Sequence, residues 1–189
     1  MTADPTSQAA DAPAEEMIVL VDEHDGEVGV CGKMETHRRS LRHRAFSVIV
    51  KNAAGEVLIQ RRADGKYHSP GLWANACCGH PRVGEAVDLA ASRRLREELG
   101  FGCELHATRS HSYCVDVGGD MIENEFVHVF FGLFDGTVLP NADEVSAYRW
   151  LAPEVLLADA DNNPGRYAPW FRDYLAVFGD QIASWRPAP

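Results

Sequence analysis

The chain has 189 residues, of which 46% are hydrophobic and 24% are charged, and this composition excludes a disordered, collagen-like or coiled-coil protein. A chain of this length is expected to form one folded, soluble domain with a real core. Its net charge of -10 argues against nucleic acid or an anionic membrane as the main partner. A small anionic ligand would therefore need a locally basic pocket.

The two ends and the cysteines set the expected compartment. Residues 1–16 have neither a basic start nor an apolar stretch, so we expect a disordered acidic tail there, not a secretory signal, and a folded domain over 17–189. The longest nearly continuous apolar run, 126–134, is far shorter than the roughly 18 to 20 residues of a spanning helix. Five cysteines without a secretory context favour reduced thiols in a cytoplasmic protein, which we expect to be a monomer or weak dimer.

The first half of the chain is rich in hairpin signals. Residues 17–22 and 27–30 are predicted to be strands joined by a turn at Asp25-Gly26. Residues 45–51 and 56–61 are predicted to form a second hairpin, because Asn52 and Gly55 suit a tight reversal.

The second half mixes helices with further strands. Residues 84–99 are predicted to be a helix with a C-terminal cap at Gly100, since apolar residues recur every four positions. Strands are expected at 111–117, 125–134 and 147–151, and a last helix from about 169 to 185 with Trp170, Tyr174 and Phe178 on its apolar face. Strands and helices do not alternate regularly, which favours an α/β (α+β) class: a single compact domain with a mixed β-sheet flanked by helices.

One spaced set of charged residues and glycines stands out in the predicted helix and the loop before it. The set is Gly79, Glu85, Arg93, Arg94, Glu97, Glu98 and Gly100. Arg94 and Glu98 lie one helical turn apart, so the helix displays carboxylates beside guanidinium groups. Carboxylates bind Mg²⁺, and Mg²⁺ binds diphosphate oxygens. A solvated helix face with ordinary ion pairs is the alternative, but the full spacing resembles the Nudix box of diphosphate-handling enzymes.

The box departs from the hydrolytic pattern at one position. The Nudix hydrolases have a Glu directly after the Arg, whereas this chain has Arg94 after Arg93. One metal-binding carboxylate of the hydrolases is therefore missing, which counts against cleavage of a diphosphate.

A second group of residues has the chemistry of a metal site. Its members are Cys78, His80, His37, His43, Glu123 and Glu125. Glu123 and Glu125 are two apart on a predicted strand, so their side chains share one face. Three imidazoles and two carboxylates suit Mn, Fe or Zn, with Mg possible. Taken singly, such residues are ordinary surface or hydrogen-bonded groups; the other buried or surface histidines, His68, His106, His111 and His128, are expected to be structural.

Five segments in order extend the resemblance to one family. They are 43–47, 75–81, 93–100, 123–125 and 144–150. Together they resemble the type I isopentenyl-diphosphate isomerases, a family with the Nudix fold, over roughly residues 17–185. The resemblance implies an isomerase of isoprenoid biosynthesis that interconverts isopentenyl diphosphate and dimethylallyl diphosphate, its small-molecule substrates, by metal-dependent protonation and deprotonation. Cys78 and Glu125 match the acid/base groups of the family, and Cys77 should point the opposite way.

The resemblance also implies two metal sites and a substrate pocket. The family's ligands for Mn²⁺, Zn²⁺ or Mg²⁺ match His37, His43, His80, Glu123 and Glu125. A second ion, Mg²⁺, is expected on Glu98 and the backbone carbonyl of Cys78, bridging to the diphosphate. The expected substrate contacts are Lys33, Arg62, Lys66, Arg94, Tyr113 and Trp170. Trp170 matches the indole that faces a carbocation in the family.

Two alternatives remain open at this point. One is a Nudix diphosphohydrolase, which would release phosphate from nucleoside diphosphate substrates. The other is a non-catalytic Nudix-like module that binds a metal or a nucleotide. A flavin or nicotinamide enzyme is not indicated, because the chain has no G-x-G-x-x-G after a predicted strand.

Overall fold

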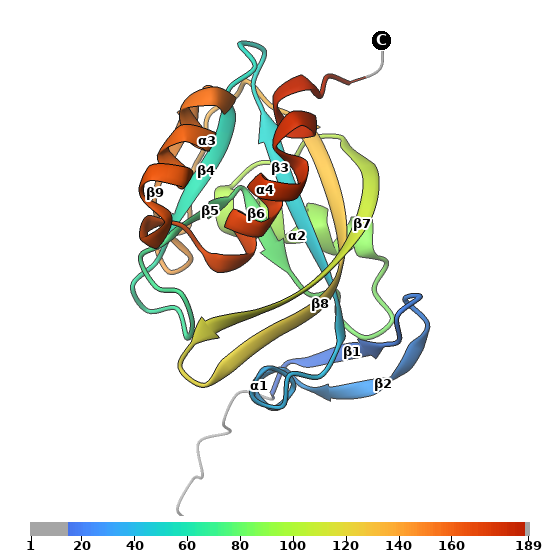
Figure 1. The fold of residues 1–189 in the computed structure, drawn as a ribbon. Helices are drawn as coiled ribbons and strands as arrows, with labels where there is room; N and C mark the ends of the chain where they lie inside the picture. The colour runs from blue at the N-terminus through green and yellow to red at the C-terminus, as the bar shows by residue number, and fades with distance from the viewer. Residues whose placement is uncertain (1–14, 188–189) are drawn as a thin grey trace, which may run out of the picture.

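The computed structural model describes residues 15–187 of the chain, with nine strands and four α-helices (Figure 1). The strands are β1 (Met17–Val21), β2 (Glu27–Gly32), β3 (His43–Lys51), β4 (Val57–Arg62), β5 (Trp73–Asn75), β6 (Cys77–Gly79), β7 (Leu105–Gly118), β8 (Met121–Leu133) and β9 (Val145–Leu151). The helices are α1 (Lys33–Arg38), α2 (Val87–Leu99), α3 (Pro153–Asn162) and α4 (Pro169–Ser184), with a 3₁₀ turn at Pro164–Arg166. Residues 1–14 of the expected tail lie outside the described residues, and Glu16, its last residue, is hydrogen-bonded to Lys33.

Strand β3 is the centre of the molecule, because both of its faces are buried. Ala45 and Ile49 pack into the core cluster that includes α3 and α4, whereas Phe46 and Val48 pack into the cluster that includes α2. Figure 1 shows α4 on one side of the sheet and α2 on the other. The mixed sheet flanked by helices that the sequence predicts is thus confirmed. The apolar run of β3 is nearly continuous because both faces of this strand are buried.

The pairing of β8 aligns three functional side chains. β8 runs parallel to β3, with His43 opposite Glu125, and antiparallel to β7, with Tyr113 opposite Glu125. Opposite residues in neighbouring strands have their Cβ atoms about 4.5 to 5.5 Å apart. Glu125 is therefore flanked by an imidazole on one side and a phenol on the other.

The predicted hairpin of β3 and β4 is wrong beyond its turn. The turn forms as expected at 52–55, but the two strands pair only at Lys51 and Val57 and then separate. β6 pairs with β3 and β5 pairs with β4 in the gap between them. Three-residue strands carry too short a pattern to predict, and their insertion brings residues 73–80 into the centre of the fold.

The remaining elements agree with the sequence to different degrees. α2 begins at Val87, three residues later than predicted, and is capped by Gly100, whose left-handed φ of 73° lets its N–H bond to the Arg96 carbonyl; α4 matches the predicted last helix. β7 begins earlier than predicted, at Leu105, where it pairs with the part of β8 that adjoins β3, and β8 begins earlier, at Met121, in a ribbon with β7 beyond β3. α1 and α3 were not predicted; α1 is short and has no capping side chain, whereas Pro153 at the start of α3 is a usable signal.

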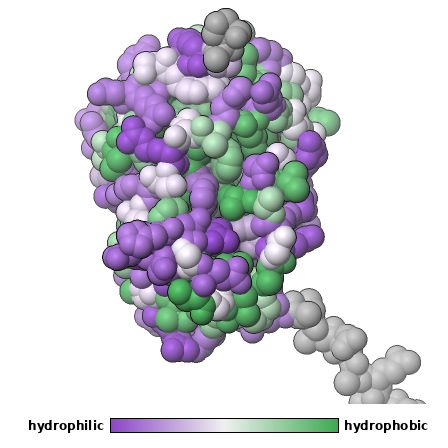
Figure 2. Space-filling model, turned by 90° about the vertical axis from the view of Figure 1, so that its right-hand side faces the viewer, coloured by the Kyte–Doolittle hydropathy of each residue, from purple (hydrophilic) through white to green (hydrophobic). Residues whose placement is uncertain are grey.

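The surface is mixed in character. On the face in Figure 2, hydrophilic side chains predominate and hydrophobic ones form small separate groups. Within residues 15–187, the helices are too short or too polar to cross a membrane.

Candidate active site

A cavity of about 440 Å³ opens among α1, the 63–72 loop, β6, α2, β8 and the start of α4. Eleven of the predicted catalytic, metal-ligating and substrate-contacting residues line it: Lys33, Arg62, Lys66, Cys78, His80, Arg94, Glu98, Tyr113, Glu123, Glu125 and Trp170. His37 and His43 are fully buried behind this lining, beside His80. The tertiary structure thus brings together residues that are spread over more than 130 positions of the chain.

Four of the five predicted ligands of the first metal site converge on one point. One ligand atom from each of His37, His43, His80 and Glu125 lies within 4.8 Å of the others. The Nδ1–H of His37 donates to the Lys33 carbonyl at 2.6 Å, and that of His43 donates to the Leu41 carbonyl at 2.8 Å. A carbonyl only accepts, so both rings are fixed with a bare lone pair at Nε2.

Around these lone pairs the protein offers one donor, the Nε2 atom of His80, which lies 3.1 Å from His43 Nε2 and 3.0 Å from Glu125 Oε1 and can donate to only one of them. The Nε2 atom of His37 is buried and has no hydrogen-bond partner among residues 15–187. The Nε2 atom of His43 faces the Oε1 atom of Glu125 at 3.4 Å, and both atoms are acceptors. A cation between them would convert this repulsion into ligation, so the residues present fit a divalent metal ion.

The pKa values support neutral imidazoles around one carboxylate. Burial lowers the pKa of His37, and it lowers the pKa of His80 to about 4 despite the hydrogen bond to Glu125. Burial would raise the pKa of Glu125, but His43 and His80 outweigh it and lower that pKa below the ordinary range. Neutral imidazoles and an ionised carboxylate are the forms that bind metals.

Glu123, the fifth predicted ligand, lies to one side of these four residues. Its Oε2 atom accepts from the Tyr113 hydroxyl at 3.2 Å, and that hydroxyl is also hydrogen-bonded to Glu125. Burial raises the pKa of Glu123 well above its ordinary value, and the charge of Glu125 adds to the increase. The nearest imidazole nitrogen to Glu123 belongs to His68, whose Nε2 atom lies 3.3 Å from Oε1.

The two adjacent cysteines face opposite sides, as expected for an extended segment. Cys77 is fully buried in the core cluster under α2, whereas Cys78 lines the cavity. The Cys78 thiol donates to Asn75 Oδ1 at 3.1 Å. The Asn75 side-chain amide in turn donates to three oxygens, those of Ser47, Val48 and Cys77, which fixes its orientation. Burial raises the pKa of Cys78 far above its ordinary value, so the thiol carries its proton at neutral pH.

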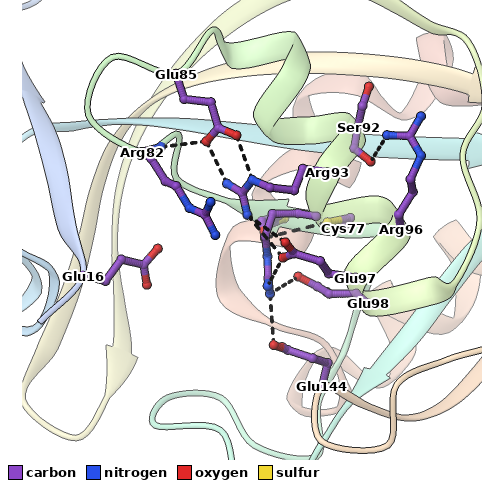
Figure 3. Close-up of polar contacts among 12 residues, drawn as sticks. Glu16, Cys77, Arg82, Glu85, Ser92, Arg93, Arg96, Glu97, Glu98 and Glu144 are labelled. Atoms are coloured by element: carbon purple, nitrogen blue, oxygen red, sulfur yellow. Dashed lines mark hydrogen bonds and ion pairs between the residues drawn. The ribbon is translucent and has the colours of Figure 1, made fainter. Parts of the chain in front are cut away.

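Arg94 and Glu98, two residues of the box, line the same cavity. Figure 3 shows Glu97, Glu98 and Glu144 converging on one guanidinium group, and the contacts identify it as that of Arg94. Its Nη2 atom lies 2.7 Å from Glu98 Oε1, while the other oxygen of Glu98 accepts from Gln60 at 2.9 Å. Glu98 is therefore buried with both carboxylate oxygens in use.

The other predicted substrate contacts form the rest of a basic rim. Lys33 pairs with Glu16 at 2.8 Å, and Lys66 pairs with Glu144. Arg62 donates to the backbone carbonyl of His68 and lies over the Trp170 ring, 5.1 Å from its centroid. The four predicted cations thus line one cavity, but Lys33, Lys66 and Arg94 are each paired with glutamates that line it too.

Sequence reasoning missed several residues of this cavity. His68 was expected to be structural, but the 63–72 loop folds over the cavity and places it there, buried against Trp170. Its position between the basic residues Arg62 and Lys66 and the CCGH segment was an available signal. Glu16, Gln60 and Asn75 were missed too, because only tertiary contacts connect them to the site.

Comparison with known proteins agrees with this geometry. A family model described as NUDIX domain matches residues 41–173. DR0079 from Deinococcus radiodurans has a TM-score of 0.70 at 24% identity, over 88% of this chain and 99% of that one. The MutT protein from Methanosarcina mazei Go1 has a TM-score of 0.61 at 19% identity, over 74% of this chain and 94% of that one. The fold and the box define a Nudix-domain protein.

Relatives of higher identity narrow the assignment. Isopentenyl-diphosphate Delta-isomerase 2 of Photorhabdus laumondii subsp. laumondii is 48% identical over 91% of this chain and 98% of its own length. Isopentenyl-diphosphate Delta-isomerase of Burkholderia multivorans is 48% identical over 83% of this chain and 89% of its own length. The chain belongs to the isopentenyl-diphosphate Delta-isomerase family.

Proposed function

We propose that this chain interconverts isopentenyl diphosphate and dimethylallyl diphosphate, with Cys78 and Glu125 as its acid/base groups. The observation that carries the proposal is one cavity that contains a protonated thiol, a carboxylate beside three imidazoles, and a rim of four cations. Similarity to isopentenyl-diphosphate Delta-isomerases over most of the chain also supports the proposal. Diphosphate hydrolysis is disfavoured, because Arg94 occupies the box position where hydrolases have a carboxylate.

The residues that would hold a divalent metal are His37, His43, His80, Glu123 and Glu125, and the ion we propose is Mn²⁺, Zn²⁺ or Mg²⁺. When bound, it supplies positive charge that fixes Glu125 and modifies its acidity. A second ion, Mg²⁺, would bind Glu98 and the Cys78 carbonyl beside the diphosphate. Arg94 would then transfer part of its ion pairing from Glu97 and Glu98 to the diphosphate.

The reaction moves one proton onto the substrate and takes another off. Protonation of the terminal CH₂ of isopentenyl diphosphate gives a methyl group and a tertiary carbocation, and loss of a proton from the neighbouring CH₂ forms the new double bond. Atoms and charge balance over the two steps, and no bond to phosphorus breaks. Two groups on opposite sides of an alkene perform this exchange, and we assign Cys78 and Glu125 to the two sides. Tyr113 holds the Glu125 carboxylate through its hydroxyl.

The cationic intermediate needs stabilisation and protection from water. Trp170 is 2% exposed and presents its ring to the cavity, so its face can stabilise the cation. Arg62, which lies over that ring, would have its charge compensated by the bound diphosphate. The anionic end of the substrate thus lies toward the basic rim and the alkene lies toward Trp170.

Isotope exchange tests the reaction directly. Isopentenyl diphosphate incubated with the protein and a divalent metal in deuterated water should yield dimethylallyl diphosphate with deuterium in one methyl group, detected by NMR. The absence of isomerisation with Mg²⁺, Mn²⁺ and Zn²⁺ would refute the proposed function. Release of inorganic phosphate from nucleoside diphosphates would instead indicate a hydrolase, and tight metal binding without turnover would indicate a binding module.

Matched variants test the two acid/base residues. Cys78→Ala and Glu125→Gln should each lower turnover by about 10²- to 10⁴-fold, the usual contribution of general acid/base catalysis. Cys77→Ala is the control, because that thiol is buried away from the cavity, and it should retain turnover. Full activity in either of the first two variants would contradict the assignment.

We further infer that this protein acts on a small molecule in the cytoplasm and works as a monomer or weak dimer. We also infer that it binds neither nucleic acid nor membranes. The free thiols of all five cysteines and the net charge of -10 support this inference. Light scattering of the purified protein and fractionation of cells that express it test these two properties.

A further inference from the structure

His68 is a buried residue of the cavity to which neither the family resemblance nor the acid/base chemistry gives a role. It lies in the loop between β4 and β5 and is 5% exposed. Its backbone carbonyl accepts two hydrogen bonds from Arg62, and its ring packs edge-on against Trp170 with the centroids 5.5 Å apart. The loop therefore fixes this imidazole inside the site.

Neither nitrogen of the His68 ring makes a hydrogen bond within residues 15–187. Nδ1 is buried and has no partner, and Nε2 lies 3.3 Å from Glu123 Oε1 without hydrogen-bond geometry. A buried imidazole nitrogen without a hydrogen bond is costly, which points to a partner other than a protein group.

His68 also lies within ligation distance of two expected metal ligands. One ligand atom from each of His37, His68 and Glu123 lies within 4.8 Å of the others. This set shares His37 with the set of His37, His43, His80 and Glu125. Glu123, which is absent from the four-residue set, is thereby connected to the metal centre on the side of His68.

We propose that His68 is an additional ligand of the metal centre, on the side of Glu123, where it forms a ligand set with His37 and Glu123. The proposal rests on the metal-dependent function proposed above. Imidazole nitrogens together with a carboxylate suit a divalent ion such as Mn²⁺ or Co²⁺. The same loop links metal binding to the substrate end of the cavity, because Arg62 is held by the His68 carbonyl.

Metal titration of the whole chain tests the proposal without any assay of turnover. Mn²⁺ is titrated into metal-free protein and the free ion is followed by electron paramagnetic resonance. His68→Ala should bind Mn²⁺ about 10- to 100-fold more weakly than the parent, and added imidazole should recover part of the loss. His106→Ala is the control, because this histidine lies outside the cavity, and its affinity should be unchanged.

Cobalt spectra distinguish a ligand from a neighbour of a ligand. Loss of a ligand should change the intensity of the Co²⁺ d–d bands in His68→Ala, whereas a merely adjacent residue would leave them unchanged. Unchanged bands or unchanged Mn²⁺ affinity in His68→Ala would overturn the proposal. His37→Ala separates this failure from that of the metal centre: if it weakens binding while His68→Ala does not, only the role of His68 is wrong. If neither variant weakens binding, the metal centre itself is wrong.

Discussion

The ion pair between Glu85 and Arg93 connects the loop after β6 to α2, and its contribution to stability depends on pH. Arg93 Nε lies 2.7 Å from Glu85 Oε1 and Nη2 lies 2.8 Å from Oε2, which is the bidentate geometry (Figure 3). The backbone N–H of Arg82 also donates to Glu85 at 2.9 Å. The Arg93 hydrogen bonds, with smaller help from Arg82, lower the pKa of Glu85 from 4.5 to about 2.

The magnitude follows from this difference. One pKa unit corresponds to ~1.4 kcal/mol, so the full difference is worth ~3 kcal/mol at neutral pH. The side chains are 18% and 21% exposed, and water screens part of the attraction. Glu85→Gln should therefore lower the free energy of unfolding by about 2 kcal/mol at pH 7, which corresponds to a fall of about 4 to 8 °C in Tm for a chain of this size.

The pH dependence has a definite sign. Because the folded pKa lies below the unfolded one, the stabilisation is complete above about pH 4.5 and is lost as the pH falls toward 2. Urea unfolding followed by circular dichroism should thus show a parent-to-variant gap at pH 3 that is less than half the gap at pH 7.

A matched control separates this pair from ordinary surface pairs. Glu35→Gln removes an ion pair with Arg39 whose side chains are 50% and 60% exposed and 3.5 Å apart, so it should change stability by less than about 0.5 kcal/mol. If Glu85→Gln is no more costly than Glu35→Gln, or if its cost is the same at pH 3 and pH 7, the reasoning is refuted.

Three further predictions concern the core, the cavity and the metal. Lys51 is 1% exposed, and its Nζ donates to the carbonyls of Ile182 and Ala183 at the end of α4. Lys51→Met should therefore lower the unfolding free energy, measured in urea titrations, by about 2 to 4 kcal/mol. A loss below about 1 kcal/mol would contradict this prediction. Trp170→Phe should lower turnover about tenfold and Trp170→Ala further, measured as the rate of deuterium incorporation, because the smaller ring stabilises a cation less; equal rates would exclude a cation-facing role. Removal of metal by a chelator should abolish turnover. It should also lower Tm, measured by calorimetry, by about 5 to 10 °C relative to protein with metal at about 100 times its Kd. Unchanged turnover and unchanged Tm would contradict a bound ion.

Local sequence determined the elements whose signal lies within one segment. Four-residue apolar spacing and Gly100 predict α2 and its end, and apolar runs predict β3 and β8. Chemical type and spacing also made the cysteine, histidine and glutamate residues candidates for a metal site, and the resemblance to the isomerase family added the roles of Cys78 and Glu125 and the basic residues.

Only the tertiary structure decided how these parts meet. The parallel register of β3 and β8 places His43 opposite Glu125, and no local pattern specifies a pairing between strands about 80 residues apart. The insertion of β5 and β6 between β3 and β4 replaces the expected hairpin, because hydrogen bonds to the inserted strands satisfy both. His68 reached the cavity for the same reason: burial of a loop depends on what it folds against. The net charge of -10 is a property of the sequence, but only folding gathers four cations from separate segments around one cavity.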